Sequence, residues 1–399
     1  MRAPAADPCL EDPLAEQAAV VSGMSTEQRY EYWAALALKY TPGLGNRSWQ
    51  RLLNAFGSAA LAVKNLNNWR DFGIRAELAN TFRAEKWRDD ATVEWRALHQ
   101  YPHGILLWDN PYYPPLLKAT HNPPLFLYYQ GDVTLLGNPK VAIVGARAAS
   151  PEGLNACAVV SRRLSAAGVT VVSGLARGID KTAHVAALEG GPGSTIAVLG
   201  TGLDVVYPAE HAKLQRQIAT QGLLLTEHMP GARPEARHFP IRNRIISGLS
   251  LGVLVVEAAA RSGSLITARL ALEYGREVFA VPGRFAAARA LGGQELIRQG
   301  AKPVFAAEDI LSELMPHLAE EPLPYPAGES SAGRPPRQTP ADSLEGQILH
   351  TLENNGSIHI DSLCSGLKVP AAAVNSALVM LEVEGLVTRL PGMVYALKN

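Results

Sequence analysis

The strongest constraint on the fold is a regular alternation of apolar strands and helices in the middle of the chain. Six short apolar runs begin at positions 141, 169, 195, 223, 251 and 277, so they recur about every 25 to 30 residues. Each interval contains a helical stretch such as GLNACAVVSRRLSAAG or SLITARLALEYG. Continuous apolar strands separated by helices are typical of a parallel sheet that is covered on both faces. The sequence therefore predicts a doubly wound α/β domain with a mostly parallel sheet.

Three of these strands end in short loops that contain glycine and arginine. The carboxyl ends of parallel strands lie at one edge of a sheet, where ligands of such folds bind. A helix N-terminus adds about half a positive charge and free N–H donors. One such loop alone is often just a tight turn, but three on one edge favour an anion-binding groove. The expected residues are Gly145, Ala146 and Arg147; Ser173, Gly174, Arg177 and Gly178; and Arg261, Ser262, Gly263 and Ser264.

A basic and aromatic segment lies between the fourth and fifth strands of this series. Residues 231–250 place four arginines, at positions 233, 237, 242 and 244, around His238 and Phe239. Arginine interleaved with an aromatic residue suits single-stranded nucleic acid, because guanidinium binds phosphate and the ring stacks on a base. Residues 140–310 carry 19 Lys and Arg against 13 Asp and Glu, a net charge of +6, whereas the whole chain is neutral. The alternative is a solvated basic face with Phe239 in the core.

The composition and the absent motifs exclude several classes of protein. The 399 residues contain three widely spaced cysteines, Cys9, Cys157 and Cys364, with no CxxC pair, which favours a reducing cytoplasm over a disulfide framework. No run reaches about 18 apolar residues, so we expect a soluble cytoplasmic protein without membrane segments. The sequence has no GxxxxGK[ST], GxGxxG or HExxH motif. We therefore expect no cofactor, no metal site and no catalytic residues.

The segments before the alternating region predict a tail and a helical module. Residues 1–26 are expected to form a flexible tail, since nothing in them could pack. Residues 27–100 are expected to be helical, with Gly43 and Gly45 in a tight turn that resembles a helix-hairpin-helix. The alternative for this region is a small packing module without DNA contact. Residues 101–315 are expected to form the main domain, whose proline-rich start should be extended and cover one edge of the sheet.

The segments after the main domain predict a linker and a second small domain. Residues 316–343 contain seven prolines in 28 positions, which is typical of a linker. Residues 344–399 read as three helices followed by two strands around Pro391-Gly392, which predicts a winged helix. Its third helix, 371–385, has no Lys or Arg and carries Glu382 and Glu384. DNA phosphates require cations, so we expect this helix to contact protein, with at most weak DNA binding through Arg389 and Lys398.

Several long motifs in a fixed order resemble one known family. These are VAIVGAR, VVSGLARGIDKTAH, TIAVLGTGLDVVYP, FPIRNRIISGLS, VLVVEAAARSGSLITARLALEYGREVFAVPG and ELIRQGA. Together they resemble the DprA/Smf family of DNA-processing proteins over roughly residues 101–315. The resemblance implies a Rossmann-like domain that binds single-stranded DNA, preceded by a helical SAM-like module and followed by a winged helix. It also implies a homodimer without enzymatic activity that protects incoming DNA and loads a RecA-type recombinase during natural transformation.

The family motifs extend the set of expected DNA-binding residues. The Gly-Ser/Ala-Arg motif falls on Gly145, Ala146 and Arg147, and its arginine is expected to hold a phosphate. The basic and aromatic segment supplies Arg237, Phe239, Arg242, Asn243 and Arg244. The resemblance also suggests Lys213, which follows the Tyr207-Pro208 pair. The sequence departs from the family at Gln294, where asparagine is common, in a region that the resemblance associates with dimerisation.

Two other functions remain open from the sequence. The first is a nucleoside-monophosphate phosphoribohydrolase, a related class that carries a PGGxGTxxE loop where this chain has Arg261–Ser264. The glutamate of that pattern does not match, because Glu273 lies six residues after Thr267 rather than three. The second alternative is a protein-interaction scaffold whose groove binds no DNA.

Overall fold

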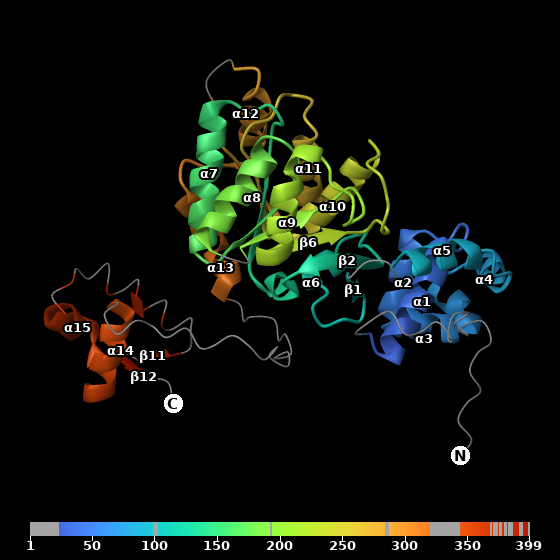
Figure 1. Ribbon diagram of the computed structural model, residues 1–399, viewed down its shortest axis with the longest axis horizontal. Helices are drawn as coiled ribbons and strands as arrows, with labels where there is room; N and C mark the ends of the chain where they lie inside the picture. The colour runs from blue at the N-terminus through green and yellow to red at the C-terminus, as the bar shows by residue number, and fades with distance from the viewer. Residues whose placement is uncertain are drawn as a thin grey trace. The chain divides into compact units, whose positions relative to one another are not determined.

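The computed structural model describes two compact units, and each is considered by itself (Figure 1). The division falls between Pro326 and Ala327. The described residues are 24–98, 103–191, 194–283, 287–319 and 344–397, the last range with gaps at 368, 370–373, 375–376, 379–380, 382–385 and 391–393. Nearly all of the expected tail and most of the expected linker lie outside these ranges.

The first unit is built on a nine-stranded sheet with the order β1-β2-β6-β5-β4-β3-β7-β8-β9. The strands are β1 (Gly104–Leu107), β2 (Phe126–Gly131), β3 (Lys140–Val144), β4 (Thr170–Ser173), β5 (Thr195–Val198), β6 (Leu223–Thr226), β7 (Gly252–Val255), β8 (Glu277–Ala280) and β9 (Lys302–Pro303). All pairs from β6 to β9 are parallel, which confirms the mostly parallel sheet. The proline-rich lead-in supplies β1 and β2, which add to the β6 side of the sheet in antiparallel pairs.

Helices cover both faces of the sheet, as the unbroken apolar strands require. They are α6 (Pro115–Lys118), α7 (Pro151–Ala166), α8 (Ile179–Gly190), α9 (Ala212–Gln221), α10 (His238–Leu249), α11 (Ser264–Glu273), α12 (Leu291–Arg298) and α13 (Ala307–Ala319). Successive residues of β3 belong to different cores, since side chains alternate across a strand. Val141 and Ile143 pack with α7, α8 and α13. Ala142 and Val144 belong to the core that contains apolar side chains of α9, α10 and α11.

A helical module precedes the sheet in the same unit. It contains α1 (Thr26–Tyr40), α2 (Asn46–Phe56), α3 (Ala59–Lys64), η3 (Leu66–Phe72), α4 (Ala76–Arg83) and α5 (Arg88–Leu98). The turn between α1 and α2 uses Gly43 with φ of 81°, as the glycine spacing predicts. The module is joined to β2 by buried polar contacts, since the hydroxyls of Tyr32 and Tyr128 lie 2.7 Å apart. Glu94 of α5 also accepts hydrogen bonds from Lys39 and from Tyr128.

Besides helical positions at 374, 377–378 and 381, the second unit contains two helices and a small sheet in its described residues. These are α14 (Leu344–Asn355), α15 (Ile360–Leu367) and the strands β10 (Ile358–His359), β11 (Val387–Leu390) and β12 (Val394–Leu397). The strands pair antiparallel in the order β10-β12-β11 around a core that includes Ile348, Leu363 and Tyr395. Most of the expected third helix, with Glu382 and Glu384, lies outside the described residues, as does Lys398. No helix in the described part of the chain has the length and apolar character needed to span a membrane.

Candidate nucleic-acid interface

A pocket of about 520 Å³ opens at the carboxyl edge of the sheet. It lies where β3 and β7 are adjacent and their following helices, α7 and α11, pass to opposite faces of the sheet. Such a divergence leaves a crevice in which doubly wound folds bind ligands. The loop after β3 contributes Gly145 and Arg147, and the start of α11 contributes Ser264 and Thr267. The pocket thus occupies the edge that the strand-end loops predict.

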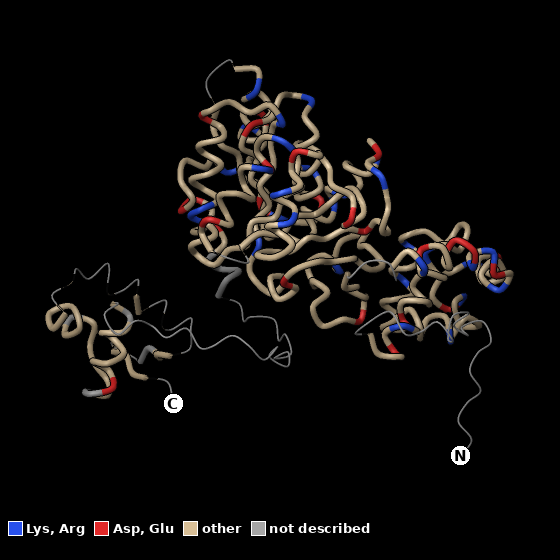
Figure 2. The backbone as a smooth tube through the Cα atoms, viewed as in Figure 1, with Lys and Arg blue, Asp and Glu red and all other residues tan. Residues whose placement is uncertain are grey.

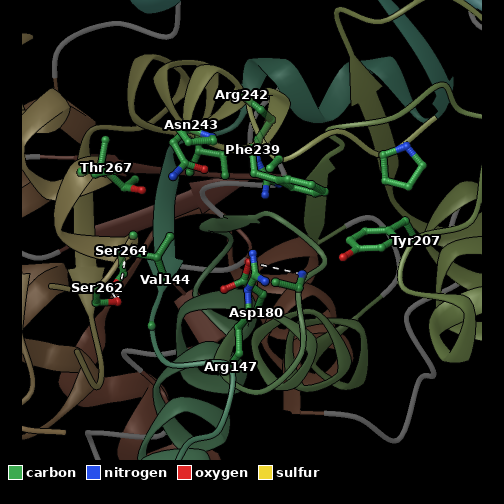
Figure 3. Close-up of a pocket in the computed structure, with 18 residues that line it drawn as sticks. Val144, Arg147, Asp180, Tyr207, Phe239, Arg242, Asn243, Ser262, Ser264 and Thr267 are labelled. Carbon is green, nitrogen blue, oxygen red and sulfur yellow. Dashed lines mark hydrogen bonds between the residues drawn. The ribbon is translucent and has the colours of Figure 1, made fainter. Parts of the chain in front are cut away.

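Lys and Arg are interspersed with Asp and Glu along the backbone of this unit (Figure 2). Three residues at the mouth of the pocket combine an arginine with two aromatic rings. The guanidinium of Arg147 lies 5.9 Å from the centre of the Phe239 ring, and the ring of Tyr207 lies 5.3 Å from Phe239. Arg147 is exposed, whereas Phe239 is half-buried. A cation over an aromatic face is an arrangement that can take a phosphate and a base together (Figure 3).

A buried arginine forms part of the wall beside this cluster. Arg242 of α10 is 5% exposed and donates from Nη1 to the carbonyl of Val198, while its buried Nε has no partner among the described residues. Burial lowers the pKa of Arg242 to about 10, and nearby Asp180 opposes this shift. The guanidinium lies against Gly174, because a Cβ built there would be 2.2 Å from Nη1. Gly174 therefore contributes to the site because its lack of a side chain leaves room for the Arg242 guanidinium.

The loop after β4 does not offer its backbone amides to a ligand. The N–H groups of Gly174 and Ala176 donate to Oδ2 of Asp180, at 3.2 and 3.3 Å. Burial raises the pKa of Asp180, while nearby Arg242 and these two hydrogen bonds lower it. The N-terminus of α7, after β3, is similarly occupied, since Glu257 accepts from the backbone N–H of Ser150 at 2.9 Å. The protein's own carboxylates fill both positions where the sequence pattern suggested an external anion.

The loop after β7 differs because α11 has no acidic residue in its first turn. Gly263 precedes the helix without capping it through a side chain, and the hydroxyls of Ser262 and Ser264 lie 2.7 Å apart. Ser262, Gly263 and Ser264 all line the pocket. This helix N-terminus therefore remains available to a negative group, in contrast to the other two loops.

The structure brings together about half of the residues expected from the sequence. Gly145, Arg147, Phe239, Arg242, Asn243, Ser262, Gly263 and Ser264 line the pocket. Gly174 and Arg177 line a smaller hollow of about 30 Å³ that shares Arg147, Phe239 and Arg242 with it. Arg177 is held there by an ion pair with Glu210. Ala146 and Gly178 act through their backbone, since a Cβ on Gly178 would be 2.3 Å from the Ala146 carbonyl oxygen.

Five other expected residues lie outside both hollows. Ser173 is fully buried and donates to the carbonyl of Ile143 at 2.6 Å, so it closes the strand rather than facing a ligand. Arg244 is buried in an ion pair with Glu227, and exposed Arg237 pairs with Glu235 at 2.8 Å. Lys213 and Arg261 are exposed, and neither lines the pocket. Ser173, Arg237 and Arg244 thus make contacts within the protein, whereas Lys213 and Arg261 are exposed outside the pocket.

Asp180, Tyr207 and Thr267 are not among the residues expected from the sequence to bind DNA, yet all three line the pocket. Asp180 follows the glycine loop directly in the run ARGID, at the first turn of α8. An acidic residue at that position is a signal that the loop amides have an internal acceptor. Tyr207 precedes Pro208 in the sequence. The contact of its ring with Phe239 depends on the fold, and no local sequence pattern predicts it.

Comparisons with known proteins show which family the chain resembles. A family model for DNA recombination-mediator protein A matches residues 104–315, and a model for the DprA winged helix domain matches residues 332–393. The DNA processing protein DprA of Streptococcus pneumoniae is 46% identical over 225 residues, covering 56% of this chain and 78% of that protein.

Two further matches extend over more of the chain. Protein Smf of Escherichia coli is 42% identical over 296 residues, covering 74% of this chain and 78% of that protein. The X-ray structure of DNA processing protein A from Streptococcus pneumoniae is 39% identical in sequence and matches with a TM-score of 0.61, covering 71% of this chain and 97% of that one.

Proposed function

Because the chain belongs to the DNA recombination-mediator protein A family, we propose that its pocket binds single-stranded DNA. In this proposal the protein protects incoming strands and passes them to a RecA-type recombinase during natural transformation. The recombinase partner, the homodimeric state and the cytoplasmic location rest on the family resemblance described for the sequence. The DNA-binding step rests in addition on the pocket itself.

The observation that carries the proposal is the cluster of Arg147, Phe239 and Arg242 at the β3–β7 crevice. Guanidinium groups pair with phosphate, and an aromatic face accepts any base, so the cluster suits a single strand of any sequence. Two apolar side chains that line the pocket, Ile266 and Tyr207, are 39% and 40% exposed, so the pocket has an apolar rim that faces solvent. A free mononucleotide would leave such a rim in water, whereas neighbouring bases of a polymer can cover it.

The composition of the pocket favours binding over catalysis. Among the residues that line it, Asp180 is the one carboxylate, and its Oδ2 already accepts two backbone N–H groups. The lining contains no His, Cys or Lys. Glu273, the residue nearest in sequence to the catalytic glutamate of the phosphoribohydrolase pattern, is exposed on α11 and does not line the pocket. The described lining therefore offers a hydrolase one carboxylate, Asp180, which the loop amides already engage.

The test is fluorescence anisotropy of a labelled single strand and of the same sequence as a duplex, across a salt series. Each neutralised phosphate should contribute about −0.7 to the slope of log affinity against log salt for a single strand. We expect tight single-strand binding with a slope of several phosphates and much weaker duplex binding. No binding at low salt would overturn the proposal. Release of free base from a panel of nucleoside monophosphates would favour the hydrolase alternative instead.

A further inference from the structure

Leu175, in the loop after β4, has a backbone conformation that leucine rarely adopts. Its φ is +55°, in the left-handed region, and its side chain is 1% exposed. For a residue with a Cβ this conformation costs roughly five- to thirtyfold in equilibrium population. Such strain persists only where the surroundings hold the residue in place, and it is common at ligand sites. The contacts of Leu175 therefore identify the groups that hold the loop in this strained conformation.

Two buried histidines hold both backbone polar groups of Leu175. Its N–H donates to Nε2 of His184 at 3.3 Å, and its carbonyl accepts from Nδ1 of His211 at 3.0 Å. His184 belongs to α8, whereas His211 ends the short helix η5 (Ala209–His211), so the clamp joins two elements. The two residues are 0% and 2% exposed. Neither histidine lines the pocket, and both lie behind the loop.

The hydrogen-bond network fixes the tautomer of His184. The hydroxyl of Thr195 donates its proton to the carbonyl of Val171 at 2.8 Å. The same hydroxyl oxygen lies 2.7 Å from Nδ1 of His184, so Nδ1 must be the donor in that contact. Nε2 is then unprotonated and accepts the N–H of Leu175. Burial, reinforced by Arg242 and His211, lowers the pKa of His184 to about 3, which keeps this neutral form at ordinary pH.

The position of Leu175 determines the positions of its two neighbours. The N–H groups of Gly174 and Ala176 both donate to Asp180, which lines the pocket. The backbone of Gly174 also supports the guanidinium of Arg242, with no room for a Cβ between them. If Leu175 relaxed to a negative φ, the flanking peptide planes would rotate and Arg242 would lose its support. The strained conformation therefore sets the shape of one pocket wall.

We propose that His184 and His211 are positioning residues, which clamp Leu175 in its left-handed conformation and so hold Gly174 and Arg242 in place for DNA. This inference rests on the proposed function, because it assigns the clamp to a DNA-binding wall. The two histidines touch no DNA themselves. Their contribution is to make the wall rigid before the strand arrives, which avoids an ordering cost on binding.

Matched substitutions can separate the clamp from general packing. His184→Leu removes the acceptor, whereas His184→Gln keeps an acceptor close to the position of Nε2. Likewise, His211→Leu removes the donor, whereas His211→Asn keeps one close to Nδ1. We expect each leucine variant to weaken single-strand binding by roughly five- to thirtyfold, the equilibrium cost of the unsupported conformation. The glutamine and asparagine variants should stay within about twofold, by the same reasoning.

The decisive control is His184→Leu in a Leu175→Gly background. Glycine adopts positive φ without strain, so it should need no clamp. In that background the His184→Leu substitution should change affinity by less than about twofold. An equally large loss in both backgrounds would overturn the proposal, since it would assign His184 to packing alone. Unchanged binding by folded His184→Leu and His211→Leu proteins would also overturn it, as would His184→Gln binding as weakly as His184→Leu.

Hydrogen exchange of peptides that cover residues 174–178 gives a readout without DNA. We expect faster exchange in His184→Leu than in His184→Gln. If the unmodified protein binds no single strand, the proposed function fails, and this measurement still tests the clamp. Equal protection of the loop in the two variants would show that the histidines do not hold it. Where a leucine variant does not fold, the Leu175→Gly background and the His211 pair provide the same comparison.

Discussion

The loops after β4 and β7 have similar sequences but present different surfaces to a ligand. Each combines serine and glycine with an arginine before a helix. In the β4 loop the three successive N–H groups of residues 174–176 donate to Asp180 and His184. In the β7 loop α11 begins without an acidic residue, and Ser262 and Ser264 face the pocket. The first loop is a rigid wall, and the second is the open helix terminus.

The difference shows that a glycine loop before a helix does not by itself define an anion site. What decides is whether the chain supplies its own anion within the first helical turn. Asp180 does so for α8, and Glu257, in the loop after β7, does so for α7 by accepting from its N-cap residue Ser150. The four predictions below test this distinction between a closed wall and an open terminus, beginning with the largest expected effect.

The largest effect is expected from Gly174→Ala, with Gly263→Ala as its counterpart in the open loop. A Cβ at position 174 would be 2.2 Å from Arg242 Nη1, whereas one at position 263 meets no atom within 4 Å. Displacing the buried guanidinium of Arg242 from its hydrogen bond to the Val198 carbonyl costs about 2 kcal/mol, so Gly174→Ala should weaken single-strand binding by about thirtyfold. Gly263→Ala should leave the wall formed by the loop after β4 intact. Anisotropy titrations measure both, and equal losses would remove the distinction between the two loops.

Arg147→Ala should weaken binding by about tenfold, because one charge-assisted hydrogen bond to phosphate is lost. The loss should be the same for all sequences, since phosphate contacts carry no sequence information. The salt slope should become less steep by about 0.7. Arg163→Ala is the matched control, because Arg163 is exposed and pairs with Glu308 at the far end of α7. A loss confined to particular sequences would contradict the assignment of Arg147 to phosphate.

The stability of the closed wall should depend on pH through His184. Its pKa is about 3 in the folded protein and about 6.5 when unfolded, so below pH 6.5 the unfolded chain binds the extra proton. The free energy of unfolding should therefore fall with decreasing pH, and this residue contributes up to about 1.4 kcal/mol per pH unit. His184→Gln should make the dependence shallower between pH 6 and 4.5 by about that amount, in denaturant titrations. An unchanged slope would mean that His184 titrates normally.

The smallest effects are expected at basic residues outside the pocket. Lys213→Ala and Arg237→Ala should each change single-strand affinity by about twofold or less, since exposed charges contribute little when they are distant from the ligand. Arg237 already pairs with Glu235, and Lys213 lies on α9. A tenfold loss at either position would show that the strand runs beyond the pocket along that side. The same anisotropy assay provides the measurement.

The sequence predicts the sheet well because its signal is repeated and local. Each apolar run defines one strand, and the regular spacing requires helical crossovers, so the parallel order follows with few alternatives. The edge strands β1 and β2 were expected only as an extended lead-in, since their antiparallel pairing depends on contact with β6 rather than on their own pattern.

The site is harder to predict because it depends on the direction of single side chains. Arg242 and Arg244 lie two positions apart on α10, and a helix turns through about 200° over that distance. One guanidinium therefore reaches the pocket, while the other pairs with Glu227. Nothing in the run RNR distinguishes them before the helix is placed on the sheet. The strain at Leu175 and its two histidines is equally hidden, since the partners are 9 and 36 residues away in sequence.

The most direct test of the central claim is photo-crosslinking of a single strand that contains 5-iodouracil, followed by mass spectrometry of the crosslinked peptides. If a base stacks at the mouth of the pocket, the crosslinks should fall on Phe239 and Tyr207, whose rings lie 5.3 Å apart. They should disappear when unlabelled single strand competes. Crosslinks confined to the helical module or to the second unit, with none in the pocket, would contradict the account.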